Sequence, residues 1–264
     1  MSNPTDKPDA ACREIRQSVL WASKESGHGH IPTSFSVVEL LYSAYSVMRH
    51  DPKKPDWDER DMFILSKGHA ALGHYATLAH FGYFDANELS AFGAHGSRFG
   101  CHADRFKVPG AEASTGSLGH GIGLAVGMAL ANRIRKTDRK IYVLIGDGES
   151  NEGSVWEAVM VAANLKLANL TILFDGNMSQ SRSLQITDAA DRFRAFKAEA
   201  HQVDGHDVAA LQAALQAEAE TVKVIVADTI KGHGCRTLTE EMFAWHRRSP
   251  KEDEYQQLLK ELDA

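Results

Sequence analysis

The sequence predicts an α/β fold, with a mostly parallel sheet and helices on both of its faces. Short apolar runs alternate with helical segments along the second half of the 264-residue chain. The strongest runs are Ile141–Ile145, Leu170–Phe174 and Val222–Thr229, which are apolar at successive positions, as buried parallel strands are. Because no repeat or linker-like stretch interrupts the sequence, we expect one domain over residues 1–264.

Further strands and a set of helices complete this expectation. In the first half, Cys12–Ser26 has helical periodicity, and Ser36 and Glu39 have the spacing of a capping box at a helix start. Further on we expect a strand, a helix, a long glycine-rich and histidine-rich loop, and a closely packed buried helix, at Met62–Leu65, Ala70–Phe81, Gly93–Gly119 and Leu118–Ala131. In the second half we expect helices and one weak strand, at Ser154–Leu167, Ala189–Phe196, Val208–Ala219 and around Gln202.

Composition excludes several classes of protein. The formal net charge of -6 argues against a nucleic-acid-binding protein, which normally carries a basic surplus. The longest apolar stretch, Gly121–Ala131, is shorter than the roughly 20 residues that span a bilayer. The three cysteines are too far apart for a metal-binding pair, and the first residues do not resemble a secretory signal. We therefore expect a cytoplasmic protein without nucleic-acid or membrane partners.

Polar residues follow the predicted strands at the edge where parallel sheets bind ligands. Asp147 lies between two glycines after one strand, and Asn177 follows the next. Carboxylate and amide oxygens are ligands that Mg²⁺ accepts. Glycine lets a ligand approach the backbone closely, and a helix N-terminus favours phosphate. The pair therefore indicates a metal–phosphate site, and Lys231 follows the last strand at the same edge.

This spacing resembles the thiamine-diphosphate motif, and longer segments resemble the transketolase family. The matching segments follow the family's order over most of the chain: Ser26–Pro32, Leu65–His69, Gly100–His102, Ser114–Ala129, Gly146–Ala158 and Thr229–Gly234. The resemblance implies a thiamine-diphosphate-binding (PP-type) domain that holds thiamine diphosphate with Mg²⁺, for which Ca²⁺ or Mn²⁺ can substitute.

The resemblance also implies a role for individual residues. The metal ligands are Asp147, Asn177 and, through its carbonyl, Ser179. The cofactor-binding residues are Gly116, Ser117, Leu118, Gly146, Asp147, Gly148, Glu149, Asn177 and Lys231. The catalytic residues are His28, His69, His102, His246 and Glu152, the last as an acid that links two active sites across a dimer interface. Imidazole suits proton transfer to sugar oxygens at neutral pH.

Several histidines and two substitutions stay open. His120 fits either the cofactor loop or a surface position, and the roles of His74, His95, His206 and His233 are undecided. Surface or packing positions are expected for His50, His80 and His201. Gly29-His30 and Ala103 stand where many family members have Pro-Gly and Pro, which leaves the sugar specificity open.

The function that the resemblance implies is two-carbon ketol transfer from a ketose phosphate to an aldose phosphate. A full transketolase chain also carries a pyrimidine-binding and a C-terminal domain, whereas this chain ends at Ala264. We therefore expect a separate subunit with those two domains, in an α₂β₂ assembly. The alternatives are the α subunit of a 2-oxo-acid dehydrogenase and a non-catalytic cofactor-binding scaffold. A metallohydrolase would need a His-Glu-x-x-His type of motif, which the sequence lacks.

Overall fold

A single parallel sheet organises the chain. The computed structural model describes residues 8–263, and in them five strands pair in the order β1-β2-β3-β5-β4. The strands are β1 (Met62–Leu65), β2 (Ile141–Gly146), β3 (Leu170–Gly176), β4 (Glu199–Asp204) and β5 (Lys223–Asp228). All four pairings are parallel, which confirms the predicted fold class. The weak strand expected around Gln202 is β4, at the edge of the sheet.

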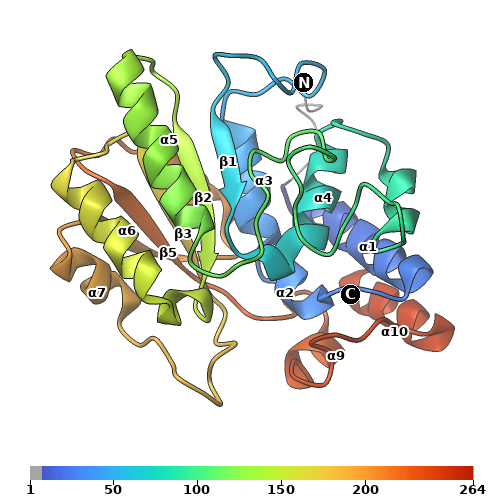
Figure 1. The fold of residues 1–264 in the computed structure, drawn as a ribbon. Coiled ribbons are helices and arrows are strands. Elements are labelled where there is room, and N and C mark those ends of the chain that lie inside the picture. Colours follow the sequence, from blue (N-terminus) through green and yellow to red (C-terminus); the bar gives the residue numbers. More distant parts are fainter. Residues whose placement is uncertain (1–7, 264) are drawn as a thin grey trace.

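Three helices cover one face of the sheet. They are α5 (Gly121–Arg135), α6 (Gly153–Asn164) and α7 (Ala189–Ala195), which lie together on one side in Figure 1. Alternate strand residues, among them Ile64, Val143 and Ile172, form a buried cluster with the apolar side chains of these helices. The cluster explains why the strand sequences are apolar on this face.

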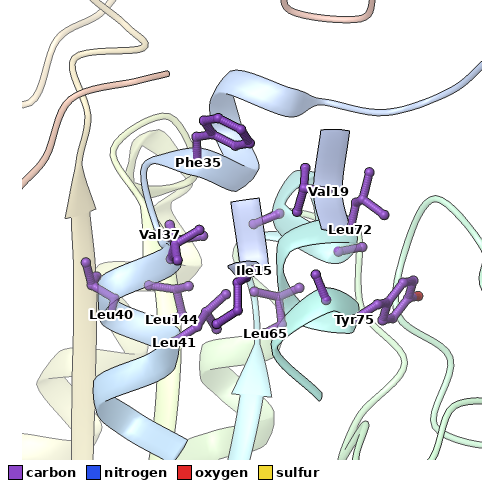
Figure 2. Packing of buried hydrophobic residues seen from close by; sticks show 14 of the residues in the cluster. Ile15, Val19, Phe35, Val37, Leu40, Leu41, Leu65, Leu72, Tyr75 and Leu144 are labelled. Carbon is purple, nitrogen blue, oxygen red and sulfur yellow. The ribbon is translucent and has the colours of Figure 1, made fainter. Parts of the chain in front are cut away.

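A thicker helical layer covers the opposite face. It contains α1 (Pro8–Ser26), α2 (Ile31–Phe35), α3 (Val38–Val47), α4 (Ala71–His80), α8 (Val208–Gln216), α9 (Arg236–Glu240) and α10 (Glu252–Asp263). Figure 2 shows Ile15 of α1, Leu41 of α3, Leu65 of β1 and Leu144 of β2 in the buried cluster of this layer. The strands are thus buried on both faces, as the continuous apolar runs predict.

Short 3-10 helices and one long loop complete the chain. The 3-10 helices are η1 (Gly68–Ala70), η2 (Ala86–Ala91) and η3 (Glu149–Asn151). The expected loop over Gly93–Gly119 contains neither helix nor strand. Among the described residues, no helix has both the length and the apolar character needed to cross a membrane.

Two local predictions were wrong. Ser36 and Glu39 do not form a capping box: α3 starts after Val37 without a side-chain cap. Ser36 instead donates to the Asp175 carboxylate, and Glu39 forms an ion pair with Arg16, so tertiary partners took both side chains. The helix expected to be buried all round is α5, which has one open side, where Leu124 is 46% exposed.

Candidate active site

The loops that follow β2, β3 and β5 meet at a cavity of about 390 Å³ at the carboxyl edge of the sheet. Most of the predicted site residues line this cavity: Leu118, Gly146, Asp147, Gly148, Glu149, Asn177, Ser179, Lys231, His69 and His246. Lys67, Thr33 and Gln180, which the sequence did not single out, line it as well. Glu152 is exposed at the start of α6 and is not among the lining residues.

The three predicted metal ligands lie together. The Ser179 hydroxyl donates to Asp147 Oδ1 at 2.6 Å, and the Ser179 backbone N–H donates to Asn177 Oδ1 at 3.0 Å. Met178, between the latter two, has a φ of 58°, which is uncommon for a residue with a side chain and often marks a functional turn. Asp147 is 5% exposed and Asn177 is 1% exposed. Buried oxygen atoms held this close suit a divalent cation with a preference for oxygen.

The predicted cofactor loop is shaped by glycine. Gly116 has a φ of +142°, and a Cβ there would lie 2.7 Å from the His102 ring. A Cβ on Gly68, at the start of η1, would lie 2.6 Å from the same ring. Ser117 is exposed and Leu118 lines the cavity. Only glycine at these positions lets the loop, η1 and His102 approach one another.

Glu149 supports this loop from behind. Its carboxylate accepts hydrogen bonds from the Gly119 N–H at 2.9 Å and from the Ser66 hydroxyl. Burial raises the pKa of Glu149, and these hydrogen bonds act in the opposite direction. Glu149 therefore joins the loop before α5 to the ends of β1 and β2.

Histidine rings form a second part of the site. The centroid of His69 lies 5.7 Å from that of His102 and 6.0 Å from that of His246. The fourth ring of the group belongs to His30, at 4.7 Å from His69 and 5.2 Å from His246. The structure therefore brings together three of the four predicted histidines with one that the sequence comparison passed over.

The position of His28 corrects the sequence-based choice. His28 is exposed, and its ring lies beside Gly93, where a Cβ on the glycine would be 3.1 Å from it. His30 immediately precedes α2 and carries a buried Nε2 atom without a hydrogen-bond partner. Pro32, in the first turn of α2, was the available signal, because proline favours that position and fixes where the helix begins.

Burial keeps these imidazoles neutral. The pKa of His30 is lowered to about 3 and that of His69 to about 4, first by burial and then by the neighbouring histidines. Burial also lowers the pKa of His246. The pKa of Lys231 falls to about 8, by burial and then by the charge of Lys67. Near pH 7 the site thus holds uncharged rings, which can accept a proton or a hydrogen bond, beside lysine ammonium groups.

The other histidines have structural positions. His50 contacts the Tyr83 hydroxyl at 3.0 Å, which matches the expected packing role, and His74 contacts the Tyr45 hydroxyl at 2.8 Å. His120 is exposed and is not among the residues that line the cavity, and His95 and His201 are also exposed.

A separate polar cluster lies under the Lys231 loop. Glu39, His206 and His233 have ligand atoms within 4.8 Å of one another. Their geometry is that of a supporting network rather than a metal centre: both Glu39 oxygens accept from Arg16, and His206 spans from Glu39 to the Ile230 N–H. The network holds the backbone beside Lys231.

Comparison with known proteins decides the family. Residues 9–263 match the family model described as "Transketolase, thiamine diphosphate binding domain". The chain belongs to the transketolase family. One of the two subunits of an apulose-4-phosphate transketolase from Actinobacillus succinogenes is 39% identical to it, over 97% of this chain and 96% of the relative. A 6-deoxy-6-sulfo-D-fructose transketolase subunit from Clostridium sp. is 36% identical, over 94% of each chain.

Longer transketolases share the same fold. The structure of transketolase from Leishmania mexicana superimposes with a TM-score of 0.88 at 28% identity, and the match covers 98% of this chain. It covers only 41% of the Leishmania chain. Human transketolase is 34% identical, and here too this chain spans 41% of the relative's length.

Proposed function

We propose that this chain is the diphosphate-binding subunit of a two-chain transketolase, which uses thiamine diphosphate and Mg²⁺ to transfer a two-carbon ketol unit between sugars or sugar phosphates. The observation that carries the proposal is the contrast in coverage. The chain spans 96% of the Actinobacillus transketolase subunit but 41% of a single-chain transketolase. The remaining part of the catalytic unit would belong to a second chain, with α₂β₂ as the simplest assembly.

The cavity fits the cofactor. Asp147, Asn177 and the Ser179 carbonyl would hold Mg²⁺, and the charge of Lys231 would face the diphosphate. A Cβ on Gly148 would lie 2.6 Å from the Gln180 side chain, so the backbone here is open only because the residue is glycine. The bound cofactor would supply the chemistry that stabilises a carbanion, whereas the protein supplies orientation and electrostatics.

The histidine group would act on the sugar. His30, His69, His102 and His246 surround one edge of the site with rings that are neutral or exposed. A neutral imidazole can accept a proton from a sugar hydroxyl, and once protonated it can return that proton to a carbonyl oxygen. His246 Nδ1 lies 3.4 Å from Lys231 Nζ, so a sugar at the rings would be next to the diphosphate.

The open side of α5 and α6 supports the proposal of a partner. Leu124 of α5 is 46% exposed, and Met160 and Val161 of α6 are each 47% exposed. Gly123 and Gly127 have open space where a Cβ would be, so a partner could approach the α5 backbone closely. Adjacent exposed apolar side chains on helices that pack together are typical of a protein–protein interface. We assign this face to the second subunit.

Assembly and cofactor binding test the proposal together. Co-expressed with a pyrimidine-domain subunit, the chain should elute as one complex that binds thiamine diphosphate only with Mg²⁺, measured by titration calorimetry. Met160→Asp should prevent co-elution, whereas Glu157→Ala, at an exposed charged position on the same helix, should not. Asp147→Ala should preserve the complex and abolish the Mg²⁺ dependence. A chain that binds the cofactor equally well without Mg²⁺ would contradict the metal assignment.

A further inference from the structure

A buried network joins β3 to the first turns of the fold behind the proposed metal site. Asp175 is fully buried at the end of β3, two residues before Asn177. Lys67 forms an ion pair with its Oδ2, and the Thr229 hydroxyl donates to its Oδ1. Ser36 donates to Oδ2 at 2.9 Å. Lys67 itself is 7% exposed, so the ion pair is buried on both sides.

The network determines how the side-chain amide of Asn177 is oriented. Its Nδ2 donates to Asp175 Oδ2 at 2.9 Å and to Ser36 Oγ at 3.0 Å, so both N–H groups are used. The opposite atom, Oδ1, accepts from the Ser179 N–H at 3.0 Å. An ionised carboxylate has only acceptors, so a flipped amide would place two oxygens against each other and leave the NH₂ facing the Ser179 donor. The observed orientation is the one that satisfies every partner.

We propose that the Lys67–Asp175 ion pair, with Ser36, is a positioning device that turns the Asn177 carboxamide oxygen toward the metal site. Lys67 supplies the charge that allows Asp175 to be buried, Asp175 holds the Asn177 amide NH₂, and the oxygen is left to the cation. The three are positioning residues because they act through Asn177. The inference rests on the proposed function, since it requires Asn177 to be a metal ligand.

The pair needs an explanation because a buried ion pair is seldom retained for stability alone. Replacing such a pair with apolar residues of similar size is often neutral or stabilising, whereas removing one partner leaves a buried unpaired charge. Groups that orient a metal ligand from behind typically change metal affinity by about 10–100-fold when they are lost. The two roles therefore predict opposite outcomes for one substitution of the pair.

Two matched double variants separate these roles. K67M/D175L removes the ion pair and the acceptor for the Asn177 NH₂, whereas K67M/D175N removes the same charges but keeps an oxygen acceptor. Mn²⁺ binding is measured by electron paramagnetic resonance with thiamine diphosphate present, on the full chain with its partner subunit. We expect Mn²⁺ affinity at least about tenfold weaker in K67M/D175L than in K67M/D175N. Thermal unfolding should show both variants folded.

A milder variant covers the case in which K67M/D175L does not fold. Ser36→Ala removes only the second acceptor of the Asn177 NH₂ and leaves the ion pair in place. It should weaken Mn²⁺ binding by about fivefold, as the loss of one hydrogen bond of about 1 kcal/mol predicts.

The outcomes distinguish the inference from the function on which it rests. If the wild-type complex binds no Mn²⁺, the proposed function fails. If the wild type binds Mn²⁺ and the two double variants bind it equally well, or equally poorly, the positioning role is overturned while the proposed function stands. Ser36→Ala with unchanged affinity would overturn it as well.

Discussion

The proposed diphosphate end and the histidine end of the site are built in different ways. At the diphosphate end, Asp147 and Asn177 directly follow β2 and β3, and Lys231 follows β5 by three residues. The register of the sheet pairs Gly146 with Asp175, so these loops start level with one another. The histidines instead come from the residue before α2, from η1 and from two loops. A sheet edge aligns side chains by a rule of topology, whereas the histidine end depends on loop conformations.

Exchanging His30 and His28 as targets should produce the largest effect. His30→Ala should lower kcat/KM of the complex by about 10²–10³-fold, because its ring lies against His69 and His246 and general acid–base groups contribute at this scale. His28→Ala, on an exposed ring two residues earlier, should change kcat/KM less than about twofold. Steady-state kinetics of ketol transfer measure both variants. The opposite ranking would restore His28 as the site residue.

Removal of the Lys231 charge should produce an intermediate effect at the other end. Lys231→Met should weaken thiamine diphosphate binding by about tenfold, since it removes one charge-assisted contact from a buried position. Calorimetric titration of the cofactor measures the change, with Lys260→Met at an exposed position of α10 as the control. Because the pKa of Lys231 is about 8 without the cofactor, wild-type affinity should also decline above that pH. Equal affinities in Lys231→Met and wild type would remove Lys231 from the site.

A histidine outside the site should show a smaller effect, on stability alone. Burial lowers the pKa of His74 to about 3, against 6.5 for an unperturbed histidine. Below pH 6.5 the unfolded chain takes up a proton that the folded chain refuses, so stability falls as the pH drops toward 3. His74→Gln should reduce the pH dependence of the unfolding free energy by up to one proton, about 1.4 kcal/mol per pH unit. Urea unfolding at pH 7.0, 5.5 and 4.5 measures the slope, and an unchanged slope would contradict the burial of a neutral His74.

The sequence predicted the parts that follow periodicity and strand-end rules. Both apolar faces of β2 and β3, the parallel order of the sheet and the proximity of Asp147, Asn177 and Ser179 followed from such rules. The matching family model and the transketolase relatives confirm the family resemblance. These predictions succeed because the side chains involved are fixed by the backbone within one or two residues of a strand.

The parts that failed depend on distant partners. Ser36 and Glu39 have the spacing of a helix cap, but Asp175 and Arg16, far away in sequence, take their side chains. His28 was preferred to His30 because the loop that turns one ring out and the other in has no periodicity. Lys67 was missed for the same reason, since its partner at the end of β3 is visible only in the folded chain.

The most direct test of the whole account is ketol transfer by the purified chain, first without and then with a pyrimidine-domain subunit, in the presence of thiamine diphosphate and Mg²⁺. A panel of ketose phosphates as donors, with an aldose phosphate acceptor, would also identify the sugar. The account predicts almost no transfer by the chain alone and steady turnover after the second chain is added. Full activity of the isolated chain, or none with any such partner, would contradict it.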